Sequence, residues 1–204
     1  AILSPSLFTS KLLMQALTDI QALIIDMDGV LWEGNQPLPG LKDFFELLRE
    51  QKLAFILATN NASLTQKQYI SKLDSMGITV SAKEILTSSM ATAHYLSEQV
   101  DPHSSTALVI GEEGLKQPLI KKGFTLIDTA FNKQDKAADF VICGLDRQLS
   151  WDKLAEASLH ISAGAQFIAT NADTTLPTER GPVLGNGAIL AALQAATNIT
   201  ATVI

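Results

Sequence analysis

Leu23-Ile24-Ile25-Asp26-Met27-Asp28-Gly29-Val30-Leu31-Trp32 is the stretch from which the fold can be predicted. Its apolar beginning, together with Ala22, is short, β-branched and uninterrupted, which predicts a strand buried on both faces. Two carboxylates follow at the C-terminal end of this strand, where open α/β sheets bind their ligands. The sequence therefore predicts a parallel α/β sheet with a polar site after its first strand.

The pair Asp26 and Asp28 suits a reaction that needs a cation and a proton. With Gly29 relaxing the turn, two acids spaced i, i+2 can direct one side chain and one backbone carbonyl at a single hard cation. The second carboxylate is then free to transfer a proton. The alternative is a simple polar turn at the end of a core strand, since Asp-Gly turns are common.

A second strand and two helices extend this pattern. An apolar stripe predicts a helix over 41–51, an apolar run predicts a strand over 53–58, and another helix is expected to run through Met76. The polar cluster Thr59-Asn60-Asn61-Ala62-Ser63 follows the second strand. Because consecutive parallel strands are usually neighbours, we expect this cluster to meet the two acids at one edge of the sheet.

The rest of the chain predicts a second alternating unit and a return to the first. We expect a first core segment over residues 1–85, an α/β cap over 86–182 and an incomplete second core segment over 183–204. Helical spacing predicts a lead-in helix over 6–19, and the polar interval 133–136 predicts a solvated loop. The other expected elements are helices over 88–99, 114–122, 152–163 and 188–197, and strands over 107–110, 140–143, 167–170 and 201–204.

Composition and charge disfavour several classes of partner. The 204 residues are 47% hydrophobic and carry a net charge of −6, which argues against an electrostatic grip on nucleic acid or anionic membranes. No apolar run is long enough to span a membrane, and residues 1–20 predict no secretory leader. The single cysteine, Cys143, lies in an apolar run, which indicates a core residue in a reducing compartment. We therefore expect a cytoplasmic protein.

Four motifs together resemble one enzyme family. The first quoted stretch resembles the D-x-D-G-V-L-W signature of the haloacid dehalogenase superfamily of phosphatases, and residues 59–63 resemble its second signature, T-N-N-[SA]-S. Gly144-Leu145-Asp146 and the run 164–173 resemble the cap motifs G-L-D and G-A-x-F-I-A-T-N-x-D of the p-nitrophenyl phosphatase-like, or NagD-type, branch. The sequence departs from the branch at Ala172, where proline is usual, and at Leu184-Gly185-Asn186-Gly187, which replaces P-G-x-G.

The resemblance implies a magnesium-dependent phosphomonoesterase with a Rossmann-like core, built on a doubly wound parallel sheet, and an inserted α/β cap. Asp26 would be the nucleophile that forms an aspartyl-phosphate, and Asp28 would protonate the leaving oxygen and later activate water. Mg²⁺ would be bound by the Asp26 carboxylate and the Asp28 backbone carbonyl. The Thr59 hydroxyl and the Asn60 backbone amide would hold the phosphoryl oxygens.

The remaining polar residues of these motifs are candidates for binding phosphate or substrate, which would be a small phosphorylated metabolite such as a sugar phosphate or nucleoside monophosphate. Simpler roles stay open: the Thr59–Asn60 segment could cap a helix, and Asn171 and Asp173 could cap a helix or form a turn. The candidates are Asn61, Asp146, Asn171 and Asp173.

The last part of the sequence departs from the family. The third superfamily signature is a lysine after the cap and the fourth is an acidic pair, yet no charged residue follows Arg180. We expect the chain to be the front part of a longer protein with an unpaired sheet edge. Alone it should be nearly inactive, because losing even one charge-stabilising donor can cost about a hundredfold in rate.

Two alternatives concern function and assembly. A catalytically silent phosphate sensor or interaction domain could use the same fold, although a sensor need not retain Asp26 and Asp28. Caps of this branch often mediate dimers, so the resemblance is compatible with a homodimer.

Overall fold

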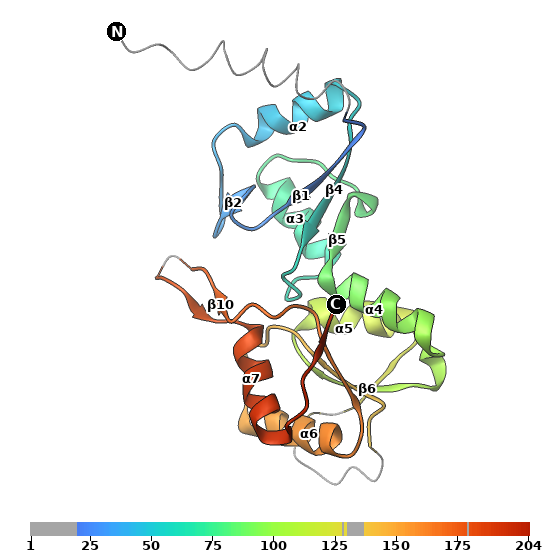
Figure 1. The fold of residues 1–204 in the computed structure, drawn as a ribbon. Coiled ribbons are helices and arrows are strands. Elements are labelled where there is room, and N and C mark those ends of the chain that lie inside the picture. The colour runs from blue at the N-terminus through green and yellow to red at the C-terminus, as the bar shows by residue number, and fades with distance from the viewer. Residues whose placement is uncertain (1–19, 128, 130–136, 179) are drawn as a thin grey trace.

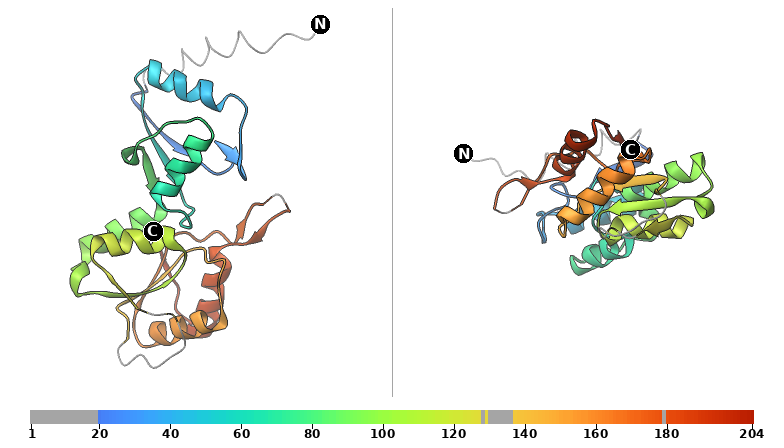
Figure 2. Two further views of the ribbon diagram at one scale, coloured as in Figure 1. Left: turned by 180° about the vertical axis from the view of Figure 1, so that it is seen from behind. Right: turned by 90° about the horizontal axis from the view of Figure 1, so that it is seen from below.

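Two parallel β-sheets, each with its own helices, form most of the described part of the chain. Figure 1 shows the first sheet above the second, and Figure 2 shows the same separation from behind. We call residues 20–87 the first unit and the described residues from 88 to 204 the second unit. The structure is a computed structural model, and it describes residues 20–127, 129, 137–178 and 180–204.

The first sheet is parallel and contains three strands. Strands β1 (Ala22–Asp26) and β4 (Ala54–Thr59) are neighbours, with Asp26 opposite Ala58, which confirms the predicted pairing. A third strand, β5 (Ile85–Thr87), pairs with β4 and was not predicted, since three residues carry little periodic pattern. The C-terminal ends of β1 and β4 therefore lie side by side.

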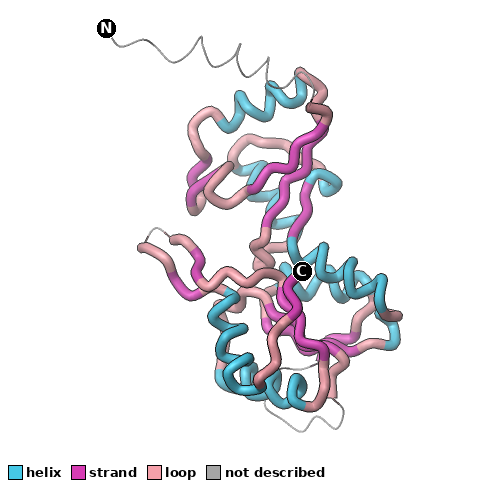
Figure 3. The backbone as a smooth tube through the Cα atoms, viewed as in Figure 1, coloured by secondary structure: helices cyan, strands magenta, loops and turns pink. Residues whose placement is uncertain are grey.

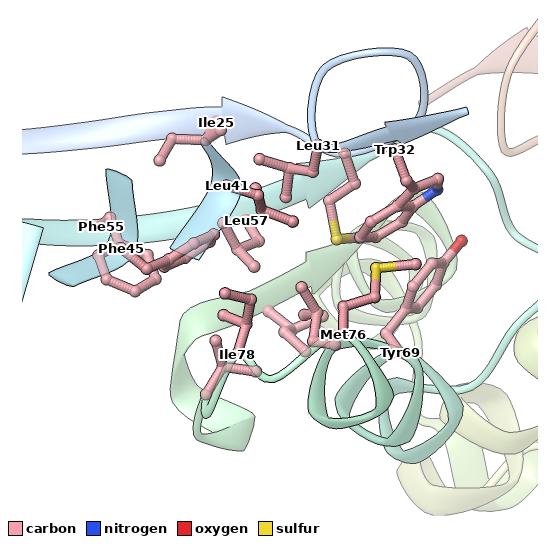
Figure 4. Close-up of a cluster of buried hydrophobic side chains, with 14 of the residues drawn as sticks. Ile25, Leu31, Trp32, Leu41, Phe45, Phe55, Leu57, Tyr69, Met76 and Ile78 are labelled. Atoms are coloured by element: carbon pink, nitrogen blue, oxygen red, sulfur yellow. The ribbon is translucent and has the colours of Figure 1, made fainter. Parts of the chain in front are cut away.

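Two helices cover one face of this sheet. Helices α2 (Leu41–Glu50) and α3 (Gln66–Ser75) place apolar side chains against the strands, because these recur at three- and four-residue spacing. Figure 4 shows the resulting cluster of buried side chains. Its members include Ile25, Leu31, Trp32, Leu41, Phe45, Phe55, Leu57, Tyr69, Met76 and Ile78.

The opposite face of the first sheet carries exposed apolar side chains. Ile24 is 82% exposed, and Ile56 and Leu86 on the neighbouring strands are exposed as well. The prediction that the first strand is buried on both faces is therefore wrong for the described structure. The reason is that α2 and α3 both pack on the side of Ile25 and Leu57.

The second sheet is also parallel and has helices on both faces, so the predicted α/β class is confirmed. Its strands, in spatial order, are β12 (Thr202–Val203), β9 (Gln166–Ala169), β8 (Phe140–Cys143), β6 (Thr106–Ile110) and β7 (Thr125–Ile127). Figure 3 shows these strands between the helices. Helices α4 (Ser88–Gln99) and α5 (Glu113–Lys122) cover one face, and α6 (Trp151–Ser162) and α7 (Asn186–Thr197) cover the other.

The C-terminal segment does not return to the first sheet, contrary to our expectation for residues 183–204. Strand β12 pairs in parallel with β9, with Thr202 opposite Ile168. Helix α7 buries Ile189 and Leu193 in the same cluster as β8 and β9. The apolar face of α7 is thus buried within the second unit. This burial explains why the C-terminal segment packs on the second sheet.

Short elements complete the described chain. The predicted segments over 6–19 and 133–136 lie outside the described residues. Within the described ranges, no helix is long and apolar enough to cross a bilayer. The short elements are the hairpin of β2 (Trp32–Glu33) and β3 (Gln36–Pro37), the hairpin of β10 (Thr175–Leu176) and β11 (Val183–Leu184), and the 3-10 turns η1 (Ala82–Glu84) and η2 (Pro102–Ser104).

Candidate active site

The two predicted acids lie where the first strand ends. Asp26 is the last residue of β1 and its side chain is exposed. Gly29 follows with a φ of 79°, a left-handed conformation that glycine adopts at little cost and that turns the chain into the β2–β3 hairpin. Within the described residues the Asp26 carboxylate has no hydrogen-bond or ion-pair partner. It is therefore free to meet a substrate or a cation.

The Asp28 carboxylate, in contrast, is held by three donors. The indole Nε1 of Trp32 donates to its Oδ1 at 2.8 Å. The Thr59 hydroxyl and the Asn61 side-chain amide both approach Oδ2 at 3.4 Å, which is long for a hydrogen bond. The structure thus brings Thr59 and Asn61 to Asp28, as predicted from the strand order.

The loop after β4 is ordered by its own side chains. The Asn61 backbone amide donates to the Thr59 hydroxyl at 3.0 Å, and the Ser63 hydroxyl donates to the Asn61 side-chain carbonyl at 2.7 Å. The next helix, α3, is capped by Thr65, which forms a reciprocal capping box with Gln68. The alternative in which Thr59 and Asn60 cap that helix is therefore wrong.

Three predicted residues meet at the boundary between the two units. The Asn60 side-chain amide donates to the Asp173 carboxylate, and the Asn171 side-chain amide donates to the Asn60 carbonyl at 2.9 Å. Ser88, the first residue of α4, also donates to this carbonyl, at 2.8 Å. The loop that follows β9 is thus tied to the loop that follows β4.

Asp146 lies apart from this group. Its carboxylate accepts from the Gln148 backbone amide at 2.8 Å and from the Lys153 ammonium at 2.7 Å, and its side chain is buried. In the described structure its recorded contacts all lie within its own loop and the start of α6. The geometry therefore gives Asp146 a structural ion pair, and a substrate contact there remains a prediction.

Three residues near the acids were not predicted as part of the site. Trp32 lies in the quoted stretch, and Tyr69 and Lys72 lie on α3, where their spacing indicated only a helix. Burial raises the pKa of Tyr69, and the nearby Asp28 charge raises it further. Burial lowers the pKa of Lys72, while Asp28 acts in the opposite direction. Only the folded structure places these two groups within electrostatic range of Asp28.

The oxygen donors at the strand end fit a magnesium ion. Mg²⁺ prefers oxygen ligands and is commonly bound by one or two carboxylates, with water and substrate phosphate completing the shell. Asp26 and the Asp28 backbone offer such donors. The described residues contain no group of three or more His, Cys, Asp or Glu side chains that could hold a metal by themselves. Any ion bound here would therefore depend on oxygens beyond these two residues.

Comparison with known proteins identifies relatives of the chain. Residues 23–125 match the haloacid dehalogenase-like hydrolase family. An acid sugar phosphatase from Staphylococcus saprophyticus is 36% identical over 179 residues, which cover 88% of this chain. That match spans 66% of the length of the relative, so somewhat less than two thirds of it has a counterpart in this chain.

Two solved structures resemble the fold closely. A 4-nitrophenylphosphatase from Thermotoga maritima superimposes with a TM-score of 0.82 at 32% identity, covering 91% of this chain and 67% of that one. A glycerol phosphate phosphatase from Mycobacterium tuberculosis, in complex with magnesium, gives a TM-score of 0.78 at 34% identity, covering 90% and 54%.

Proposed function

The chain belongs to the haloacid dehalogenase-like hydrolase family. We propose that it is part of a magnesium-dependent phosphatase that acts on small phosphorylated metabolites. The observation that carries this proposal is the contrast between the two acids. Asp26 is exposed and without a partner among the described residues, as a nucleophile requires, whereas Asp28 is held by Trp32 and lies beside Thr59.

The proposed reaction has two steps, each using both acids. In the first, an Asp26 oxygen attacks phosphorus, the bond from phosphorus to the leaving oxygen breaks, and Asp28 gives that oxygen a proton. In the second, Asp28 takes a proton from water, whose oxygen attacks the phosphorus of the aspartyl-phosphate, the bond from phosphorus to the Asp26 oxygen breaks, and inorganic phosphate leaves. Asp26 and Asp28 thereby return to their starting states.

A magnesium ion would be held by the Asp26 carboxylate and the Asp28 backbone carbonyl, and when bound it would neutralise charge on the phosphoryl oxygens. The loop after β4 would bind the same group. Thr59 would offer its hydroxyl and Asn60 its backbone amide, while Asn61 fixes the loop through its bonds to Thr59 and Ser63.

We further propose that the second unit acts as the cap and selects the substrate. The hydrogen bonds from Asn60 and Asn171 support this role, because they bring the loop after β9 to the candidate phosphate loop. The relatives are named acid sugar phosphatase, glycerol phosphate phosphatase and 4-nitrophenylphosphatase. A phosphorylated sugar or small polyol is therefore the substrate class that we expect.

The test uses the natural protein that contains residues 1–204. Phosphate release from 4-nitrophenyl phosphate, glycerol phosphate and hexose phosphates is measured with Mg²⁺ and with excess chelator. We expect turnover that needs the metal and is lost in Asp26→Asn, while Asp74→Asn, an exposed acid of α3, keeps the wild-type rate. Tight phosphate binding without turnover would instead support the sensor hypothesis.

A further inference from the structure

Trp32 makes the shortest contact to the Asp28 carboxylate in the described structure. Its Nε1 donates to Oδ1 at 2.8 Å, while the two contacts to Oδ2 are both 3.4 Å long. The Trp32 side chain is only 1% exposed, and an indole has a single donor and no acceptor. A buried indole N–H without a partner would be costly, so the ring and the carboxylate constrain each other.

Two side chains of α3, Tyr69 and Lys72, hold the indole ring in place. It stacks on Tyr69 with the ring centroids 6.4 Å apart and an angle of 23° between the planes, and Figure 4 shows the two rings side by side. The Lys72 ammonium lies 4.3 Å from the centre of the Trp32 ring and also donates to the Gly34 carbonyl at 2.9 Å. These contacts restrict rotation of the indole ring, so they fix the direction in which Nε1–H points.

The two Asp28 oxygens are therefore not equivalent. Oδ1 accepts from a rigid donor that cannot turn away or accept a proton, because indole is a donor only. Oδ2 faces the Thr59 hydroxyl, which can rotate to become an acceptor, and the Asn61 amide at the same long distance. Both contacts to Oδ2 are 3.4 Å long, so a proton on Oδ2 displaces only weak donors, whereas a proton on Oδ1 conflicts with the 2.8 Å contact from the indole.

We infer that Trp32 is a positioning residue that holds Oδ1 of Asp28 and makes Oδ2 the oxygen that exchanges a proton with the leaving group and with water. This inference rests on the proposed function, since it assigns the atom of Asp28 that acts in that reaction. Trp32 touches neither substrate nor phosphorus in this role. Its effect should therefore be greatest where the leaving group most needs a proton.

The contact itself can be tested without any activity. Residues 1–204 contain two tryptophans, so the two indole N–H signals in an NMR spectrum are assigned by losing one in Trp151→Phe. We expect the Trp32 signal to exchange slowly with solvent and to shift in Asp28→Ala. An unchanged Trp32 signal in that variant, with the rest of the spectrum showing a folded protein, would overturn the inference.

The role is tested in the natural protein by replacing Trp32 with 3-benzothienylalanine, in which sulfur takes the place of the indole N–H at nearly the same shape. Trp32→Phe is the second variant, and Trp151→Phe, whose side chain is exposed, is the matched control. Turnover is compared for 4-nitrophenyl phosphate, a good leaving group, and for an alkyl phosphate, a poor one. Both thermal stability and KM are recorded for each variant.

We expect both Trp32 variants to lose about tenfold to a hundredfold more kcat on the alkyl phosphate than on 4-nitrophenyl phosphate, with KM little changed, because a misplaced acid forfeits part of general acid catalysis, which is worth about 10²–10⁴-fold. An equal loss on both substrates, or no loss with benzothienylalanine, would overturn the inference and leave the phosphatase proposal standing. Absence of turnover in the wild-type protein would overturn both.

Discussion

Asn60 donates a hydrogen bond from its side-chain amide to the carboxylate of Asp173, which lies 113 residues later in the chain. The Asn60 carbonyl accepts a second bond from Asn171, in the same loop as Asp173. One residue after β4 is thus bound through both its side chain and its backbone to the loop after β9. This pair is the clearest link between the candidate phosphate loop and the second unit.

The Asn60–Asp173 contact should be measurable as an energetic coupling. Since both side chains are exposed, we expect Asn60→Ala and Asp173→Ala to show a coupling of about 0.5–1 kcal/mol in a double-mutant cycle of unfolding free energy. In the active protein, Asp173→Ala should raise KM more than it lowers kcat. The control is Asp74→Asn, which also removes one negative charge. If the effects of the two single substitutions are strictly additive, the coupling free energy is zero and the contact does not stabilise the fold.

Helix α5 lies so close to the loop after β4 that position 114 should not accept a side chain larger than that of glycine. A Cβ there would lie 2.4 Å from the Ala62 carbonyl oxygen and 2.5 Å from that of Leu64, and the Gly114 amide donates to the Ser63 carbonyl. We expect Gly114→Ala to lower the unfolding free energy by about 1–3 kcal/mol.

The control for that substitution is Gly111→Ala, whose Cβ would lie nearest to side-chain atoms of Leu115 rather than to backbone atoms. Chemical denaturation of both variants measures the difference. A Gly114→Ala protein as stable as Gly111→Ala would mean that the two units do not approach each other as the structure has them.

Asp146 should matter for stability, because its buried carboxylate binds the Lys153 ammonium and the Gln148 amide. Asp146→Asn leaves the partly buried ammonium without its counter-charge, so we expect a loss of about 1–3 kcal/mol in unfolding free energy. Lys153→Met in the same background should recover part of that loss. If Asp146→Asn unfolds like the wild type and only KM changes, Asp146 contacts substrate as first predicted.

The ion pair between Glu112 and Arg147 should make stability depend on pH. Hydrogen bonds from the Arg147 side chain lower the pKa of Glu112 below its ordinary value, although burial acts against them. A carboxyl whose pKa is lowered on folding adds stability at pH values above its unfolded pKa, about 4.3, and this stability is lost as the pH falls through the folded pKa. Glu112→Gln should therefore destabilise the protein at pH 7 and have little effect at pH 3.

Denaturation of wild type and Glu112→Gln at both pH values measures this dependence, with Glu46→Gln on α2, which is exposed, as the control. A difference between wild type and Glu112→Gln that stays constant from pH 7 to pH 3 would contradict the assignment.

The sequence predicted the centre of the site better than its surroundings. The placement of Asp28 near Thr59 followed from two apolar runs and the rule that consecutive parallel strands are neighbours. The contact from Trp32 to Asp28 could not be predicted, because it depends on how the hairpin β2–β3 packs on Tyr69.

Two errors in the fold prediction also have physical causes. The run over 22–25 looks the same whether one face or both are covered, so the exposure of Ile24 needed the packing of α2 and α3 to be known. Likewise, the apolar pattern of α7 fits either sheet. The packing of α7 and the pairing of β12 with β9 assign the segment to the second unit.

The most direct test of the phosphatase proposal is to trap the aspartyl-phosphate on Asp26. The natural protein containing residues 1–204 is mixed with Mg²⁺ and substrate and quenched with borohydride, which reduces an acyl phosphate to an alcohol, and its peptides are then sequenced by mass spectrometry. We expect homoserine at position 26 when substrate is present, and aspartate there when substrate is omitted. Steady phosphate release with aspartate intact at position 26 in every sample would contradict the proposed role of Asp26.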